Sequence, residues 1–247
     1  MATEIIYKNS TGKVLTKNDL EGFSGTVSWE IASENTVSLK ATKLHNKGRE
    51  FGQKGEYKSS ILQLELAAKE DPKWAYPVYD LAYTYMLMGD FEKAHGYYQK
   101  VDQMAPRGFF TVKTALYTLN GEKDGKFPKG LYMSYLSTEW LDVPKKIESL
   151  QNISQKLPKY APVWKDLISF AANDEVAIKF IENGLSASPD AETYGILLIN
   201  KALILHRSNR QKDALSILGE LALDPTSSLG TEKLAKQTLA HLVNTKS

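Results

Sequence analysis

The sequence predicts an all-helical fold of stacked helical hairpins, with a small β element before the stack and a capping helix after it. Three observations support this prediction: a stretch of 34 residues recurs directly after itself, each copy has a glycine near its centre, and each copy has a proline near its end. The composition agrees, because 42% hydrophobic and 24% charged residues are ordinary values for a globular chain of 247 residues.

The repeat is found by placing residues 41–74 over residues 75–108, an offset of 34 that brings Ala41 onto Ala75 without a gap. Small, aromatic, glycine and proline positions then coincide along the whole length of the two copies. The further matched pairs are Leu44/Val78, Gly48/Ala82, Phe51/Tyr85, Gly55/Gly89, Tyr57/Phe91, Ser60/Ala94, Leu64/Tyr98, Ala67/Val101 and Pro72/Pro106.

Each class of matched residue has a physical reason. Small side chains such as Gly48 and Ala82 let two antiparallel helices approach closely, and the aromatic pairs fill the space beside that contact. The aligned glycines allow the positive φ that ends the first helix of each copy. The aligned prolines end the second helix, because proline has no N–H and restricts the residue before it.

These two copies resemble the tetratricopeptide repeat over residues 41–107. The resemblance implies a right-handed superhelix of helical hairpins with an open, curved architecture. It also implies that the first helix of each hairpin lines a concave face, where extended peptides or partner helices bind. One departure is visible, since Leu44 and Val78 stand where this family commonly has a tryptophan early in the repeat.

Weaker copies are expected downstream at residues 127–160, 161–190 and 192–226. The final segment, residues 227–245, reads as a single amphipathic helix that covers the exposed end of the stack. Its apolar face consists of Leu234, Leu239, Leu242 and Val243.

An inserted helix is expected between the clear and the divergent copies. Pro106 and Pro158 lie more than one period apart, and the excess has the length of one helix. We place this helix at residues 107–120, with Asn120-Gly121 as its stop signal and a polar loop after it.

Residues 1–36 differ from the rest of the chain. Two β-prone runs flank Ser10-Thr11-Gly12, a hairpin-like turn, and a third alternating run covers residues 26–31. We expect a β element here, and the repeat domain at residues 37–247 with its first helix starting near Asn35. The β element caps the N-terminal end of the stack, serves as a docking element, or forms a partly ordered arm.

The residue types that support catalysis are not gathered in any recognisable motif. The sequence has no cysteine, and its four histidines lack metal-ligand spacing, so we expect no metal and no cofactor. Nucleophile and dinucleotide signatures are absent. We therefore expect a protein that is not an enzyme.

Charge and hydropathy restrict the partners further. A net charge of +2 is too small to predict nucleic-acid binding or attraction to anionic membrane. The N-terminus does not read as a signal peptide, and no apolar run is long enough to span a bilayer. We expect a cytoplasmic protein whose partner is a protein or peptide.

Specific residues of the expected concave face follow from the resemblance. In the second copy, tyrosines recur at spacings of three and four and so share one helical face. Tyrosine is favoured in binding surfaces because it gives a large contact area and a hydroxyl at little entropic cost. The candidate peptide-binding residues are His45, Arg49, Gln53, Tyr76, Tyr79, Tyr83 and Met86.

Two alternatives stay open. In the first, the tyrosines of the second copy are structural and pack against the inserted helix with Phe109 and Phe110. The second is an enzyme or small-molecule-binding protein, with His45, Arg49 and Asp80 in a site between the β element and the first repeats. The chaperone-tail clamp known in the tetratricopeptide family is disfavoured, because Asp80 stands where that mode uses an asparagine and would repel a terminal carboxylate.

Overall fold

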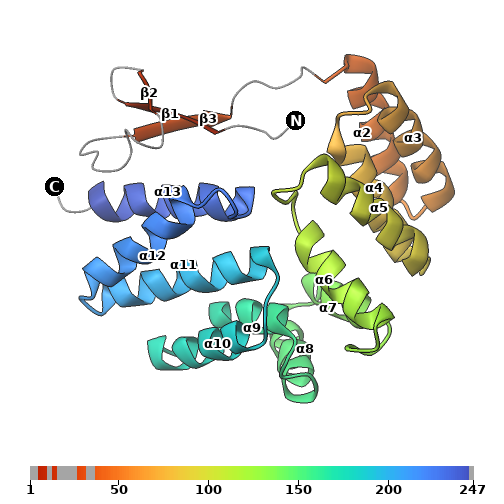
Figure 1. Ribbon diagram of the computed structural model, residues 1–247. Helices are drawn as coiled ribbons and strands as arrows, with labels where there is room; N and C mark the ends of the chain where they lie inside the picture. The colour runs from red at the N-terminus through yellow and green to blue at the C-terminus, as the bar shows by residue number, and fades with distance from the viewer. Residues whose placement is uncertain (1–4, 10–12, 16–26, 32–36, 245–247) are drawn as a thin grey trace.

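The computed structural model describes residues 5–9, 13–15, 27–31 and 37–244 (Figure 1). The first of these ranges contain three short strands, β1 (Ile5–Asn9), β2 (Val14–Leu15) and β3 (Val27–Ile31). They pair antiparallel in the order β2-β1-β3, with Tyr7 opposite both Leu15 and Trp29. The expected turn at residues 10–12 lies outside the described residues.

Two helical hairpins follow, where the sequence repeat predicts them. They consist of α2 (Leu39–Gln53) with α3 (Tyr57–Glu70), and α4 (Ala75–Leu87) with α5 (Phe91–Met104). Gly55 and Gly89 both have positive φ, of 75° and 76°, as expected for the residues that follow the first helices.

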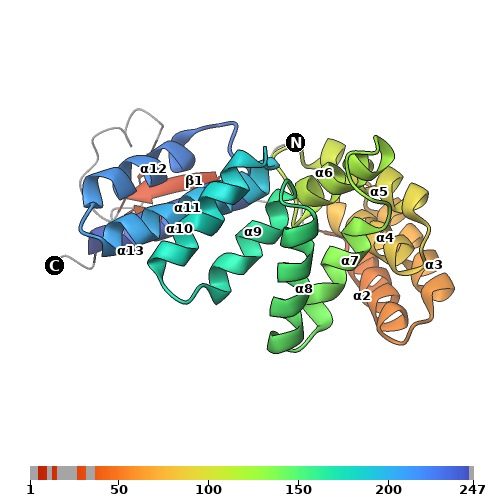
Figure 2. The ribbon, with the colours of Figure 1, turned by 90° about the horizontal axis from the view of Figure 1, so that it is seen from below.

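Two expectations about this region need correction. The first helix begins at Leu39, four residues after Asn35, because the Ser38 hydroxyl accepts from the Ala41 amide and caps the helix there. The N-terminal strands do not cover α2: both views place them on the side of the last helices (Figures 1 and 2). The outward face of α2 needs no cover, since Lys43 and Lys47 are exposed on it.

The inserted helix is present but displaced. It is α6 (Val112–Lys123), which starts later than predicted because the chain first turns through Gly108 and Phe110, whose φ values are 96° and 49°. It also continues past Gly121, which was predicted to stop it. A Cβ at Gly121 would lie 2.3 Å from the Phe127 ring, so this glycine permits close packing inside the helix rather than ending it.

The rest of the chain continues as helical hairpins of less regular form. The two hairpins that follow α6 include short 3₁₀ segments, and α13 is the last helix of the chain. The elements are α7 (Leu131–Leu136), η1 (Ser137–Trp140), α8 (Val143–Lys156), α9 (Ala161–Leu167), η2 (Ile168–Phe170), α10 (Asp174–Ser186), α11 (Ala191–Arg207), α12 (Gln211–Leu223) and α13 (Leu229–Asn244).

The helices curve until the last part of the chain meets the connection between α5 and α6 (Figure 1). The Leu229 amide at the start of α13 donates to the Arg107 carbonyl at 2.7 Å. The Thr114 hydroxyl in α6 donates to Asp190 at 3.1 Å, just before α11. In an open stack each repeat contacts only its neighbours, so the expectation of an open curve is wrong at this point.

A continuous core runs through the first half of the curve and beyond. It joins the first two hairpins to α6, α7, α8 and α9, and three tyrosines are among its largest fully buried side chains: Tyr98, Tyr132 and Tyr160. The Thr118 hydroxyl lies 3.0 Å from the Tyr160 hydroxyl, which satisfies both buried groups. Smaller clusters hold the last helices together.

Candidate binding groove

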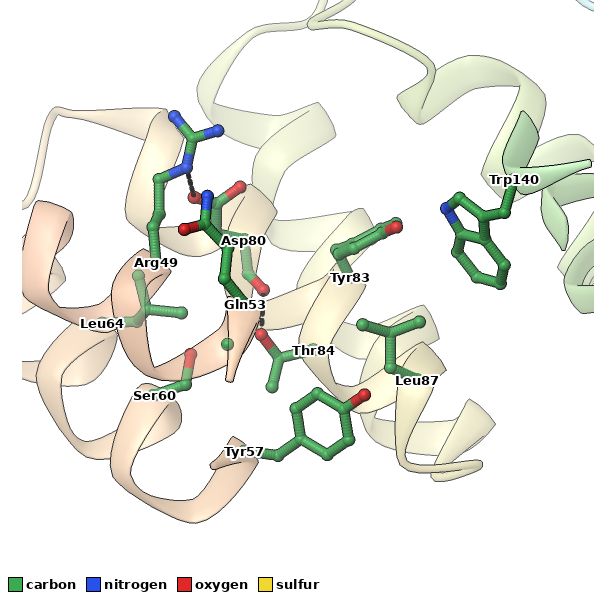
Figure 3. Close-up of a pocket in the computed structure, with 11 residues that line it drawn as sticks. Arg49, Gln53, Tyr57, Ser60, Leu64, Asp80, Tyr83, Thr84, Leu87 and Trp140 are labelled. Atoms are coloured by element: carbon green, nitrogen blue, oxygen red, sulfur yellow. Dashed lines mark hydrogen bonds and ion pairs between the residues drawn. The ribbon is translucent and has the colours of Figure 1, made fainter. Parts of the chain in front are cut away.

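A groove of about 460 Å³ lies between helices α2, α3 and α4 of the two clear hairpins and the 3₁₀ segment η1 (Figure 3). Its walls come from three separate parts of the chain, so it exists only in the folded protein. The lining residues are Arg49, Gly52, Gln53, Tyr57, Ser60, Leu64, Asp80, Tyr83, Thr84, Leu87 and Trp140.

The α2 wall is polar and largely exposed. Arg49 and Gln53 are four residues apart and therefore share one helical face, which opens onto the groove. The Arg49 Nε lies 3.8 Å from the Asp80 carboxylate on α4. Within the described part of the chain, the two terminal nitrogens of Arg49 form no hydrogen bond, so they remain available to a ligand.

His45 is positioned differently from the prediction. Its ring is only 4% exposed and does not line the groove. It lies against Trp74, with ring centroids 4.7 Å apart, and its Nε2 is 2.8 Å from the Asp80 carboxylate. Because a carboxylate only accepts, this nitrogen donates, and His45 fixes Asp80 from beneath the surface.

The three candidate tyrosines of α4 fall into two groups. Tyr83 lines the groove, where it faces the indole of Trp140 (Figure 3). Burial raises the pKa of the Tyr83 hydroxyl, and hydrogen bonding with Trp140 acts in the opposite direction. Tyr83 is therefore a neutral hydroxyl at physiological pH, able to donate to a bound ligand.

Tyr76 and Tyr79 instead pack on the residues that precede α6. The Tyr76 ring contacts Phe109 and Phe110 edge to face, at 4.9 and 5.1 Å between centroids. Tyr79 contacts the same two rings, and its hydroxyl lies 3.0 Å from the Thr111 hydroxyl. The structural alternative is therefore realised for these two tyrosines, and neither lines the groove.

Met86 is also not a groove residue. It is 1% exposed and belongs to the core, whereas its neighbour Leu87 lines the groove. Both positions follow Tyr83 by about one helical turn, and periodicity alone does not separate them. The packing of α4 against its neighbours decides which of the two points inward.

Sequence reasoning missed the wall opposite α2. Trp140 is 53% exposed at the end of η1, although a tryptophan of ordinary role is usually well buried. No local pattern places it near α4, because its position depends on how the segment after the inserted helix folds back. Tyr57 and Thr84 were also missed as lining residues.

The three residues considered for catalysis do come together, since Asp80 contacts both His45 and Arg49. No group of three or more residues suited to holding a metal ion occurs within the described part of the chain. No described helix is long and apolar enough to cross a membrane. The groove itself is lined by polar, aromatic and aliphatic side chains.

Comparison with known families bears on the second hairpin, which contributes one wall of the groove. The family model for the tetratricopeptide repeat matches residues 77–107. This segment of the chain is therefore similar to a tetratricopeptide repeat. The groove lies between the first helix of this matched segment and the hairpin before it. No curated protein matches the sequence.

Several solved structures are similar to this chain at low identity. MamA from Desulfovibrio magneticus RS-1, residues 41 to the end, is 15% identical, with a TM-score of 0.36 over 75% of this chain and 94% of that one. A thermophilic tetratricopeptide repeat protein from Thermus thermophilus is 15% identical, with a TM-score of 0.33 over 83% and 99%. The TPR2AB domain of yeast Sti1, in complex with pHSP90, is 17% identical, with a TM-score of 0.38 over 83% and 86%.

Proposed function

We propose that this protein is a non-catalytic scaffold that binds a segment of a partner protein in the groove between α2, α4 and η1. The segment lies as an extended peptide across the first helices of the two clear repeats. This position belongs to the concave side of a right-handed superhelix, as the family resemblance implies. Arg49, Gln53 and Tyr83 are the predicted binding residues that face this groove.

One observation carries the proposal. The groove presents a guanidinium, an amide, a tyrosine hydroxyl and a half-exposed indole around one hollow of about 460 Å³. A hollow of this size with apolar walls and a few convergent polar groups is typical of a ligand site. Aromatic residues and arginine are also the side chains most enriched in protein interfaces.

The catalytic alternative has less support. The His45 ring is shielded by Trp74, and its Nε2 is engaged by Asp80, so it does not reach the groove. The N-terminal strands lie away from α2 in both views, so they do not form a site with the first repeats (Figures 1 and 2). A role for His45 in holding Asp80 accounts for the arrangement.

The test is selection from a displayed library of random peptides, followed by binding measurements with purified protein. We expect Tyr83→Ala and Arg49→Glu each to weaken the selected peptides by about tenfold or more. Matched controls are Tyr194→Ala and Lys100→Glu, which change an exposed aromatic and an exposed cation outside the groove. Selected peptides that bind all four variants equally well would place the binding site elsewhere.

A further inference from the structure

We infer that the groove selects an acidic segment carrying one large apolar side chain. That side chain enters the space bounded by Tyr57, Leu87 and the Tyr83–Trp140 pair, and a neighbouring carboxylate binds Arg49. This inference rests on the proposed function and adds the chemistry of the ligand to it. Three features support it: the apolar end of the groove, its polar end and the charge of α2.

The apolar end of the groove is unusually exposed. Trp140 is 53% exposed, and Leu141 and Val143, on either side of Asp142 and beside the groove rather than in its lining, are 36% and 57% exposed. Exposed apolar clusters rimmed by polar residues mark interaction sites. Tyr83 and Leu87 form the facing wall from α4 (Figure 3). An aromatic or large aliphatic side chain is the ligand that buries this surface.

The polar end lies across the groove from Trp140 (Figure 3). Arg49 has a side chain that is 58% exposed, and only its Nε approaches Asp80, at 3.8 Å. The closer partner of Asp80 is His45, at 2.8 Å. The terminal nitrogens of Arg49 can therefore form a paired hydrogen bond with a ligand carboxylate on the side away from Asp80. Gln53 supplies an amide beside them for the peptide backbone.

The positive charge of α2 also favours an acidic ligand. The helix carries four basic residues against a single acidic one, Glu50, although Lys43 and Lys47 lie on its outward face and Lys40 pairs with Glu70, so these lysines act on a ligand only from a distance. A surface of this sign raises the encounter rate of acidic segments and lowers that of basic ones. Asp80 also lines the groove, but its carboxylate is engaged by His45 at 2.8 Å, whereas only the Nε of Arg49 approaches Asp80, at 3.8 Å. The groove therefore favours a carboxylate beside the apolar anchor.

The experiment uses the full chain and three glycine-flanked fluorescent peptides of equal length. In the first, phenylalanine precedes two aspartates; the second has alanine in place of phenylalanine; the third has two lysines in place of the aspartates. Fluorescence anisotropy measures the affinity of each. We expect the first peptide to bind about tenfold tighter than either control, and higher salt to reduce this difference for the lysine control.

Two variants keep the test independent of folding defects. Trp140→Ala should abolish the preference for phenylalanine over alanine while leaving the preference for aspartate over lysine. Arg49→Glu should reverse the preference, so that the lysine peptide binds more tightly than the aspartate peptide. A misfolded protein loses affinity for all three peptides, whereas a reversal requires direct contact with the ligand charge.

Equal affinities for the three peptides in the unaltered protein would overturn the inference, as would a preference for the lysine peptide. The proposed function fails separately. If library selection gives peptides that depend on Tyr83 but lack an apolar residue beside an acidic one, the groove is a binding site and the inferred ligand chemistry is wrong.

Discussion

The guanidinium of Arg107 donates to the carboxylate of Glu232, although 125 positions separate the two residues. The same guanidinium donates to the Ser227 carbonyl at 3.1 Å, and the Arg107 carbonyl accepts from the Leu229 amide at 2.7 Å. One residue in the connection between α5 and α6 therefore holds the first turn of α13. These contacts join the clear repeats to the C-terminal helix.

A second contact of this kind lies close by. The Glu192 carboxylate in the first turn of α11 accepts from the Thr114 amide at 3.3 Å in α6. Gly108 permits the approach, since a Cβ there would lie 3.0 Å from the Glu192 carboxylate. The curvature of the chain is thus fixed by polar contacts between distant segments, as well as by packing between neighbouring hairpins.

The first prediction concerns the Arg107 contact. Arg107→Ala should lower the free energy of unfolding by about 1–3 kcal/mol, because it removes charge-assisted hydrogen bonds to a largely buried carboxylate. Glu232 retains Lys236 as a partner, which limits the loss. Urea unfolding followed by circular dichroism measures the change.

Arg210→Ala is the matched control for Arg107→Ala. Its ion pair with Asp213 lies on the surface, where the two side chains are 63% and 49% exposed. Surface pairs contribute about 0–1 kcal/mol. If the two variants lower the free energy of unfolding equally, the Arg107 contact does not hold the distant segments together.

The second prediction is a pH dependence caused by Glu192. Burial, and next the Asp190 carboxylate, raise the pKa of Glu192 from 4.5 to about 7. The native protein therefore binds a proton that the unfolded chain has lost, and stability falls as pH rises from about 4.5 through 7. At about 1.4 kcal/mol per unit of pKa shift, the fall is of the order of a few kcal/mol.

Glu192→Gln tests this dependence. It keeps an uncharged side chain of the same size at all pH values, so unfolding free energies between pH 5 and pH 8 should vary less than in the unaltered protein. Glu182→Gln, at an exposed position on α10, is the control and should keep the original slope. An unchanged slope in Glu192→Gln would show that other groups cause the dependence.

The third prediction compares two helical glycines. A Cβ at Gly48 would lie 2.8 Å from Leu64 and 3.3 Å from the Ser60 carbonyl, so Gly48→Ala should destabilise the first hairpin by about 1–3 kcal/mol. A Cβ at Gly96 meets nothing within 4 Å. Gly96→Ala should therefore stabilise the protein by about 0.5–1 kcal/mol through helix propensity. Thermal melts show whether each variant is more or less stable than the unaltered protein. A change in the same direction for both variants would refute the close approach of α2 and α3.

The fourth prediction separates the two tyrosines. Tyr79→Ala should lower the free energy of unfolding by about 3 kcal/mol, because it removes a ring packed on Phe109 and Phe110 and the hydrogen bond between the Tyr79 and Thr111 hydroxyls. Tyr83→Ala should cost about 1 kcal/mol or less and act mainly on peptide binding. Denaturant unfolding distinguishes them. A larger loss of stability for Tyr83→Ala than for Tyr79→Ala would reverse the roles of the two residues.

The sequence predicts the clear repeats well because their determinants are local. Gly55 and Gly89 end helices through a backbone conformation that neighbouring residues do not alter. Gly121 shows the limit of this reasoning, since the same residue type lies inside a helix to admit the Phe127 ring. A glycine needed for close packing and one needed for positive φ look alike until the partner is placed.

The candidate groove was predicted only in part. Helical spacing correctly groups Arg49 with Gln53, but it also includes His45 and Met86, which the structure buries. Exposure along a helix depends on what packs against each side, and α2 and α4 meet different neighbours. The sequence did not predict Trp140 as a lining residue, because it belongs to a segment more than fifty residues after Tyr83 in the chain.

The sequence by itself determined the class of fold, the position of the two tetratricopeptide-type hairpins and the absence of cysteine chemistry, because periodicity and residue type carry these. Only the tertiary structure decided that Tyr76 and Tyr79 pack on Phe109 and Phe110, that Trp140 completes the groove, and that Arg107 holds α13. Each of these depends on contacts between segments far apart in the chain, and the energies of such contacts depend on three-dimensional approach rather than on spacing.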